Sequence, residues 1–399
     1  MIQNKDFLLS SYNYKLEENL IAQKPSNPQH QAKLLVCTNK NNKYIYSDKK
    51  IIDLVNIIDS DSILFFNDTK VYKARLKFKN KKTIRKTGKE HIIQDGEILI
   101  YKIIDNQTFY GLSSDDKNFK PGTSIFRNKN IKIISKSLRS DGIIFEIVGE
   151  KLTKFLSREG EMPLPPYIQY NKSKEKRYQS NFAKDIGSAA APTASLHFTK
   201  LLLDKLKKKG IKTEFNTLHI GLGTFKPVFE KDIRKHQIHE EDIIIDPSIF
   251  TKIAKYKSKN KNLIAVGTTT VRLIETLPYL RKSLKTKKFS KQTNKYRNNL
   301  TKGIIKKESE IIVSNIEIYG KRYKVSTRLF IIPGFKYKIV DQIITNFHLP
   351  QSSLIMMISG FMGRNNILKT YKYAQKNGYK FYSFGDAMLI KNKLITNNE

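Results

Sequence analysis

The stretch LIAVGTTTVRLIETL, residues 263–277, begins as a short apolar strand and passes directly into a helix. Gly267 ends the apolar run, and the threonines that follow it offer hydroxyls that cap a helix N-terminus. A strand joined to a helix in this way is the repeating unit of α/β proteins. Residues 263–277 therefore predict an α/β domain.

The same alternation continues on both sides of this stretch. Upstream, a short helix that stops at Gly210 leads to a strand at 211–221, and a second helix is expected at 246–257. Downstream, strand-like and helix-like segments alternate over 339–385, and residues 1–60 add more of both kinds. The pattern predicts one α/β domain around a largely parallel sheet, made from both ends of the chain.

Residues 61–149 have a different character, because short segments rich in Ile, Phe and Tyr follow one another with no helical pattern between them. These segments read SILFFND, GEILIYKIID, FYGL, TSIFR, IKIISK and IIFEIVG. Such a run is typical of a small barrel or sandwich. We expect an α/β domain from 1–62 and 152–399, an inserted β-barrel-like domain at 63–151, and a basic, low-complexity insertion loop at 281–307.

The chain of 399 residues carries 74 basic and 36 acidic residues, a formal net charge of +38. This charge fits a polyanionic partner, with nucleic acid first and a membrane surface second. Most of the excess is lysine, however, and an A- and T-rich genome imposes the same bias on any protein. Both explanations stay open at this point.

Other global features indicate a soluble, cytoplasmic protein with no membrane attachment. Cys37 is the single cysteine, so the chain can form no internal disulfide. The first residues have no apolar core long enough for a signal peptide. The longest apolar stretch, 354–362, has about half of the roughly 20 residues that a membrane-spanning helix needs.

Histidines and small residues cluster where strands are expected to end. Four of the histidines fall within 197–239, and His348 lies far downstream. His219 precedes a glycine-containing loop that could bind an anionic or nucleoside group through backbone amides, although it lacks the spacing of a dinucleotide-binding loop. Because ligands of α/β sheets collect at the carboxyl ends of strands, we expect these polar groups to share one cleft.

A metal site is the competing interpretation of one part of this region. His236, His239 and Glu241 have the side chains of a ligand set, but the HxxxH spacing on a helix is the better-known geometry. We therefore expect no metal.

Taken in order, the motifs of this chain resemble those of the S-adenosylmethionine:tRNA ribosyltransferase-isomerase family over nearly its whole length. They are LIAQKP at 20–25, NDT at 67–69, ARL at 74–76, GEMPLPPYI at 160–168, RYQ at 177–179, APTASLHFT at 191–199, HIGLGTF at 219–225, GTT at 267–269, PG at 333–334, TNFHLP at 345–350 and GDAM at 385–388. Two motif positions depart from the family pattern, since Ser195 replaces a glycine and Lys70 replaces an arginine. In addition, the arginine-rich patch that precedes LLV in the family is reduced here to HQAK at 30–33.

The resemblance implies a ribosyl transfer followed by an isomerisation. S-adenosylmethionine would donate its ribosyl group to 7-aminomethyl-7-deazaguanine at the wobble position of tRNA, giving epoxyqueuosine, adenine and methionine. S-adenosylmethionine would be a consumed substrate, and no cofactor is expected. The partner would be the anticodon loop of a tRNA, and the protein is expected to be a monomer.

The same resemblance assigns expected roles to individual residues. Proton transfer is expected from His197, His219 and His348, because histidine exchanges protons near neutral pH. Asp68, Glu161 and Asp386 are expected to orient ribose hydroxyls or amines. Thr268, Thr269 and Arg272 are expected to bind the methionine carboxylate, and Tyr167 or Phe225 is expected to stack on a base. The full set of expected substrate-binding residues is Arg75, Tyr167, Thr193, Gly221, Gly223, Thr224, Phe225, Thr268, Thr269, Arg272 and Asn346.

Two alternatives belong to other classes. A non-catalytic RNA-binding protein would account for the charge and the β module, and would retain tRNA without consuming S-adenosylmethionine. A metal-dependent hydrolase built on His236, His239 and Glu241 would lose activity with a chelator.

Overall fold

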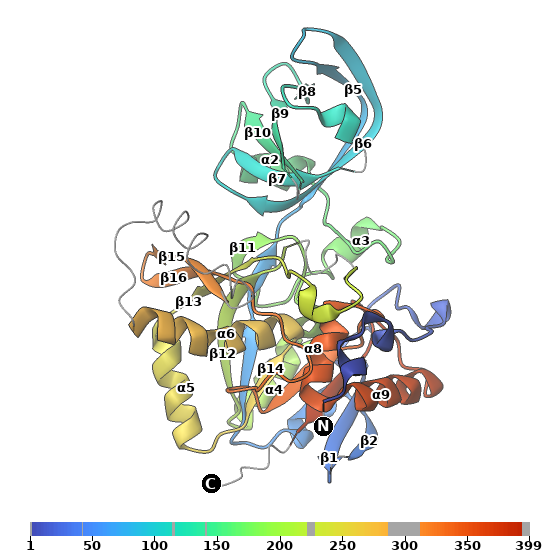
Figure 1. Ribbon diagram of the computed structural model, residues 1–399, viewed down its shortest axis with the longest axis vertical. Helices are drawn as coiled ribbons and strands as arrows, with labels where there is room; N and C mark the ends of the chain where they lie inside the picture. The colour runs from blue at the N-terminus through green and yellow to red at the C-terminus, as the bar shows by residue number, and fades with distance from the viewer. Residues whose placement is uncertain are drawn as a thin grey trace.

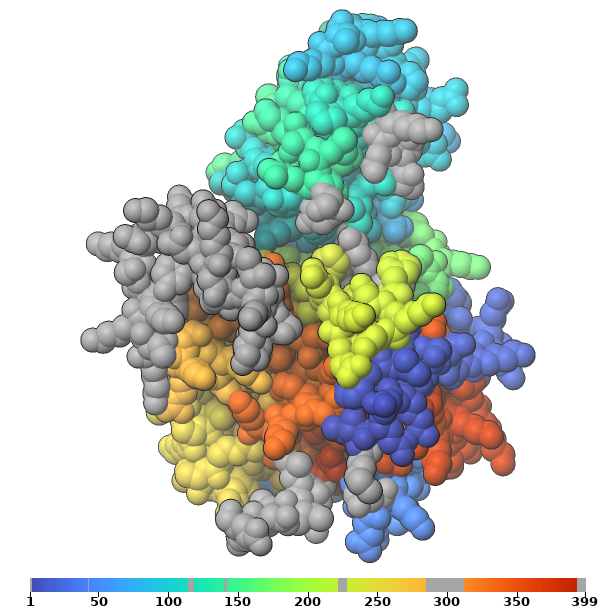
Figure 2. Space-filling model, in the orientation of Figure 1, coloured from blue at the N-terminus to red at the C-terminus, as the bar shows by residue number. Residues whose placement is uncertain are grey.

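The chain forms a large α/β lobe that carries a small β-barrel on one edge (Figure 1). This computed structural model describes residues 2–41, 43–113, 116–139, 142–221, 228–285 and 312–392. Figure 2 shows the barrel as a separate lobe above the main body of the molecule. The predicted fold class, an α/β domain from both ends of the chain with an inserted barrel, is confirmed.

A ten-stranded mixed sheet forms the centre of the large lobe. In spatial order its strands are β15 (Val313–Tyr319), β16 (Arg322–Thr327), β13 (Glu241–Ile245), β12 (Lys212–His219), β3 (Ile63–Asn67), β14 (Leu263–Val266), β17 (Gln342–Asn346), β18 (Ala387–Lys391), β1 (Lys33–Lys40) and β2 (Lys43–Lys50). The strands β12, β3, β14 and β17 are parallel, as are β18 and β1, and the other neighbours are antiparallel. The expectation of a largely parallel sheet is therefore correct only for its centre, because the pairs β15–β16, β16–β13, β13–β12, β17–β18 and β1–β2 are antiparallel.

Helices cover both faces of this sheet. One face carries α5 (Ser248–Ser258), α6 (Thr268–Lys285), α8 (Ser353–Met362) and α9 (Arg364–Lys376), and the other carries α1 (Leu54–Ile57), α4 (Lys200–Lys208) and the 3-10 helix η7 (Thr193–His197). Successive strand residues point to opposite faces, so Phe65 packs under the first group and Phe66 under the second. None of the helices in the described ranges is long and apolar enough to cross a membrane.

The predicted helix before Gly210 is confirmed together with its ends. Thr199 caps α4, since its Oγ1 accepts a hydrogen bond from the amide of Leu202 at 3.3 Å. Gly210 follows the helix with a φ of +88°, a conformation that favours glycine. The helix turns Leu202 and Leu206 into the core.

The barrel closes in the order β10-β7-β6-β5-β8-β9. Its strands are β5 (Arg75–Ile84), β6 (Glu90–Ile103), β7 (Thr108–Leu112), β8 (Ser124–Phe126), β9 (Lys132–Arg139) and β10 (Gly142–Val148). Phe78, Phe109 and Phe145 fill its interior. Helix α2 (Leu152–Glu159) follows β10, and β4 (Thr69–Val71) pairs with β11 (Asp185–Ser188) where the barrel joins the large lobe.

Two predicted boundaries were wrong. Strand β3, assigned to the β module, lies in the middle of the main sheet, so the barrel begins at Arg75 and not at 63. All of its residues are buried, as in a central strand covered on both faces. The insertion loop was placed at 281–307, but residues 281–285 are the end of helix α6, where Leu284 packs against the core. The remainder of that predicted loop lies outside the described residues.

Candidate active site

The carboxyl ends of the four parallel strands β12, β3, β14 and β17 meet at one edge of the main sheet. His219 ends β12, Asn67 ends β3, Gly267 follows β14 and Asn346 ends β17. The barrel stands over this same edge (Figure 1). The predicted convergence of distant segments at strand ends is therefore present in the fold.

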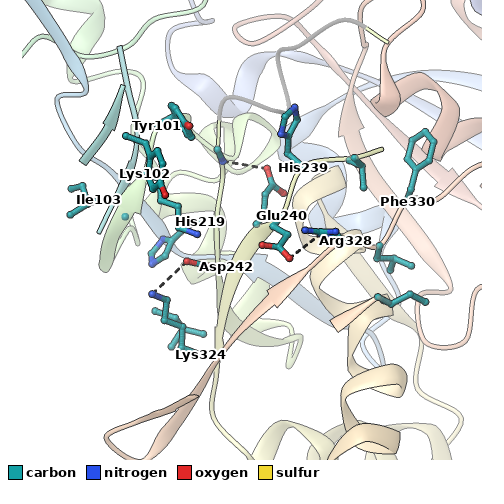
Figure 3. Close-up of a pocket in the computed structure, with 18 of the residues that line it drawn as sticks. Tyr101, Lys102, Ile103, His219, His239, Glu240, Asp242, Lys324, Arg328 and Phe330 are labelled. Carbon is teal, nitrogen blue, oxygen red and sulfur yellow. Dashed lines mark hydrogen bonds and ion pairs between the residues drawn. The ribbon is translucent and has the colours of Figure 1, made fainter. Parts of the chain in front are cut away.

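A cleft of about 2140 Å³ separates the barrel from this edge (Figure 3). Both lobes contribute to its walls, and the residues that matter most below are Tyr101, Lys102, Tyr110, Gly187, His219 and Asp242. A cleft formed between two lobes is where ligand sites most often lie.

His219 is a histidine of the cleft wall whose ring is held on two sides. Its Nδ1 lies 2.9 Å from the hydroxyl oxygen of Thr69. Its ring covers Gly187, where an added Cβ would stand 2.5 Å from Nε2. Burial lowers the pKa of His219 to about 4, although the nearby carboxylates of Asp242 and Asp185 act in the opposite direction. The imidazole is therefore neutral at pH 7 and able to accept a proton.

The carboxylates beside His219 are themselves held in ion pairs. Asp242 accepts a hydrogen bond from Ser326 Oγ at 2.8 Å and lies 3.5 Å from the ammonium of Lys324 (Figure 3). Arg322 donates to both oxygens of Asp185, at 2.7 and 3.1 Å. This guanidinium lowers the pKa of Asp185, which stays ionised.

The hydroxyl group of Thr217 connects Asp68 to Asp185. Thr217 Oγ1 is 2.7 Å from Asp68 Oδ1 and 3.1 Å from Asp185 Oδ2, so the two carboxylates share a neighbour. Burial raises the pKa of Asp68, whereas that of Asp185 is lowered. Two nearby carboxyls with pKa values moved in opposite directions are an arrangement suited to acid and base roles.

A second, smaller cavity of about 20 Å³ adjoins the cleft at the start of helix α6. Thr268, Thr269 and Arg272 line it, and both cavities share His239 and Glu241. Arg272 donates to Glu241 at 2.6 Å, to the carbonyl of His239 at 2.8 Å and to that of Thr327 at 3.1 Å. Its Nε is buried without a hydrogen-bond partner among the described residues.

Comparison with known proteins identifies the family. The model of the family described as queuosine biosynthesis protein matches residues 9–390. The chain belongs to this family. A relative from Sulfurihydrogenibium sp. (strain YO3AOP1), named S-adenosylmethionine:tRNA ribosyltransferase-isomerase, is 35% identical over 386 residues, covering 96% of this chain and 99% of the relative. A relative of the same name from Staphylococcus haemolyticus (strain JCSC1435) is 37% identical over 385 residues, covering 96% and 99%.

A solved structure is also similar to this chain. It is the S-adenosylmethionine tRNA ribosyltransferase from Thermotoga maritima, with 24% identity, a TM-score of 0.48, and coverage of 95% of this chain and 99% of that one.

The other two histidines expected to transfer protons, His197 and His348, are buried beside the end of β17, and neither is among the residues that line the cleft or the smaller cavity. His197 Nε2 lies 3.3 Å from the side-chain amide of Asn346, which also accepts a hydrogen bond from Thr193 at 3.1 Å. His348 Nε2 lies 2.9 Å from Thr345 Oγ1. Burial lowers the pKa values of His197 to about 4 and of His348 to about 3, so both rings are neutral. Their catalytic roles stay predictions.

Asp386 holds two segments of backbone together. Its oxygens accept hydrogen bonds from the amides of Lys33 and Lys380, each at 2.7 Å. Burial raises the pKa of this carboxyl group. Both oxygens are engaged, which favours a structural contribution, and the expected contact with substrate stays a prediction.

Three further predicted residues, Arg75, Glu161 and Tyr167, also lie outside the cleft wall. Arg75 and Glu161 exchange backbone hydrogen bonds at 3.1 and 2.8 Å, and Glu161 also forms an ion pair with Lys77 at 2.8 Å. The hydroxyl of Tyr167 is 2.6 Å from Ser383 Oγ, and its ring packs against Tyr382. The structure does not bring these three side chains together with His219.

The glycine loop after His219 is described only in part. Gly221 lines the cleft, and its amide donates to Glu241 at 3.3 Å. The predicted residues Gly223, Thr224 and Phe225 lie outside the described residues.

The two departures from the family motifs have different surroundings. Ser195 is fully buried in η7, and in the described part of the chain its hydroxyl has no hydrogen-bond partner. Lys70 is exposed on β4.

The metal interpretation gains no support from the geometry. His236 Nδ1 is 2.8 Å from Glu230 and its ring packs on Phe330. Across the described ranges, no group of three or more His, Cys, Asp or Glu side chains could hold a metal ion.

Several residues around His219 were missed in the sequence. They are Gly187, Asp185, Asp242, Lys324, Tyr101 and Tyr110. Asp242 directly follows Glu241, and Gly187 begins the small-residue run before His197, so both were close to residues already singled out. Only the pairing of β12 with β13 places Asp242 opposite His219.

Proposed function

We propose that this chain transfers and isomerises the ribosyl group of S-adenosylmethionine onto 7-aminomethyl-7-deazaguanine at the wobble position of tRNA. The products are epoxyqueuosine in the tRNA, adenine and methionine. The relatives' names, which join S-adenosylmethionine, tRNA and both reaction types, support this proposal. The observation that carries it is the neutral His219 in a cleft large enough for two substrates.

His219 is the proposed base for the first proton transfer. The sulfonium of S-adenosylmethionine acidifies the adjacent ribose carbon, and a base must take that proton to begin the rearrangement. His219 is neutral and faces the cleft, and the carboxylates of Asp185 and Asp242 stabilise the imidazolium that forms. The acceptor amine, with an unperturbed pKa of about 10, must also lose a proton before it can attack.

The methionine part of the substrate is assigned to the start of helix α6. The first amides of a helix are free donors, and the helix dipole favours an anion there. Thr268 and Thr269 stand at this position, and the neighbouring cavity opens beside the cleft that holds His219. We assign the carboxylate of the substrate to these amides, with the buried Nε of Arg272 as an additional donor.

Methionine leaves as a neutral thioether and adenine leaves with a proton, so the reaction needs no redox centre. We therefore propose that S-adenosylmethionine is consumed as a substrate and that no cofactor takes part. The protein acts on tRNA as a monomer in the cytoplasm, where tRNA is abundant.

Product analysis tests this function. The protein is incubated with S-adenosylmethionine and tRNA that carries 7-aminomethyl-7-deazaguanine, and adenine, methionine and modified nucleoside are quantified. Equal amounts of all three are expected, with none from the same tRNA carrying an ordinary guanine. Binding of tRNA without release of adenine would instead indicate the non-catalytic RNA-binding protein.

A further inference from the structure

The barrel side of the cleft presents a pair of tyrosines. Tyr101 on β6 and Tyr110 on β7 both line the cleft, and their ring centroids are 5.7 Å apart. Figure 3 shows Tyr101 and Lys102 at the same hollow as His219. Neither tyrosine belongs to the set expected from sequence, in which Tyr167 or Phe225 was to stack on a base.

The local strand geometry explains why these rings lie outside the barrel. Phe109 is fully buried in the barrel, so Tyr110, the next residue of β7, points away from its interior. Tyr101 follows the buried Ile100 at an irregularity of β6, where the pairing with β7 shifts register between Ile100 and Lys102. The ring of Tyr101 also packs on Gly142, where an added Cβ would stand 3.2 Å from Cε1. This contact restricts the ring, so less entropy is lost when a ligand stacks on it.

The charge of the cleft is positive after ion pairs are counted. Four acidic residues of its wall, Asp185, Glu240, Asp242 and Glu241, are paired with Arg322, Arg328, Lys324 and Arg272, respectively. The fifth, Asp105, accepts hydrogen bonds from the amides of Gln107 and Thr108 and offsets one positive charge. The basic residues of the wall for which the described chain provides no ion-pair partner within 4.0 Å are Lys102, Arg139, Lys184 and Lys235. A surplus of cations beside aromatic rings fits a polyanion that has bases to stack.

The size of the cleft also exceeds what a small molecule needs. Pockets for drug-sized ligands measure roughly 300–1,000 Å³. This cleft measures about 2140 Å³, so S-adenosylmethionine at the sheet edge leaves the barrel side open. A polymer segment is the kind of ligand that fills the remaining space.

We infer that Tyr101 and Tyr110 form a stacking platform for unpaired bases of the RNA loop, next to the base that reaches His219. Lys102 and Arg139 hold the phosphates of that loop. The inference rests on the proposed function, because it takes tRNA as the substrate. It assigns to the barrel the recognition of single-stranded RNA.

Binding of an RNA hairpin with the sequence of a tRNA anticodon stem-loop tests the platform. Tyr101→Ala and Tyr110→Ala are each expected to weaken binding by about 5- to 150-fold, because base–aromatic stacking contributes about 1–3 kcal/mol per base. Tyr101→Phe and Tyr110→Phe keep the ring and are expected to bind within about 2-fold of the unmodified protein. Lys102→Gln and Arg139→Gln are each expected to reduce the salt dependence of binding by about one unit of slope.

Three controls separate the possible outcomes. Ile92→Ala changes an exposed residue elsewhere on β6 and should leave RNA binding unchanged. Affinity for S-adenosylmethionine should be the same in all variants, and thermal unfolding should show that each one is folded. Equal RNA binding by the alanine and phenylalanine variants would overturn the platform while leaving the proposed function intact. No hairpin binding by the unmodified protein would contradict the proposed function itself.

Discussion

The imidazole of His219 lies against the backbone of Gly187, with no room for a side chain between them. An added Cβ would stand 2.5 to 2.7 Å from three ring atoms, well inside van der Waals contact. Thr69 fixes the ring from another side through its hydroxyl. The position of the proposed base therefore depends on a glycine that takes no part in proton transfer.

Gly187→Ala is expected to displace His219 and to lower kcat by about 10- to 100-fold, since a misplacement of about 1 Å can cost about 100-fold in rate. The measurement is adenine release at saturating S-adenosylmethionine and tRNA. Ile92→Ala is the control, because it shortens an exposed side chain on the barrel strand β6. An active Gly187→Ala variant would mean that the ring can move without consequence.

The acid limb of the pH–rate profile is expected near pH 4, because burial lowers the pKa of His219 to about 4. A base works in its neutral form, so protonation of His219 should lower activity only when the pH drops through this value. The acceptor amine titrates near a pH of about 10, so the profile of kcat/KM should show no break between pH 5.5 and 7. Lys324→Gln removes a cation that lowers this pKa and should move the limb to higher pH. A limb near 6.5, unmoved in Lys324→Gln, would contradict the assignment.

Ser195→Ala is expected to stabilise the protein. The serine hydroxyl is buried and has no hydrogen-bond partner in the described part of the chain, whereas alanine leaves no polar atom to satisfy. Removal of an unsatisfied buried hydroxyl is worth about 1–3 kcal/mol. Urea unfolding of both proteins gives the difference, and a destabilised alanine variant would show that the hydroxyl has a partner after all.

The parts of the fold that follow from local pattern were predictable from sequence. Thr199 and Gly210 bound a helix, and apolar runs such as 263–266 mark central strands. Strand β3 was assigned to the wrong lobe because a buried strand looks the same in a barrel and in a sheet. Strand β3 belongs to the main sheet because it pairs with β12 and β14, which lie far away in sequence.

The site was predictable only where residues end strands. His219, Thr268 and Asn346 were placed at strand ends, and the sheet brings these ends to one edge. Tyr101 and Tyr110 were missed because their meaning depends on where the barrel stands relative to the sheet. No local pattern contains that information.

His348 is expected to make the protein sensitive to acid. Its pKa is lowered by burial to about 3, below the value near 6.5 of an unfolded chain, so the unfolded state takes up the proton first. The stability contributed by the neutral ring is complete above pH 6.5 and is lost as the pH falls toward 3.

Urea unfolding at pH 7 and at pH 5 measures this effect. Between pH 7 and pH 5, the free energy of unfolding of the unmodified protein should fall by on the order of 1–2 kcal/mol more than that of His348→Gln. The reason is that each unit of pKa shift corresponds to about 1.4 kcal/mol. Other titrating groups affect both proteins alike and cancel in the comparison. Equal losses would show that His348 is not the group responsible.

The central claim is that His219 removes a proton in the cleft between barrel and sheet, and adenine release by His219→Gln tests it most directly. The substrates are S-adenosylmethionine and tRNA with the aminomethyl base. The variant should release adenine about 100- to 10,000-fold more slowly than the unmodified protein, the usual contribution of a general base, while binding tRNA with the same affinity. Adenine release at the unmodified rate by a correctly folded His219→Gln protein would contradict the account.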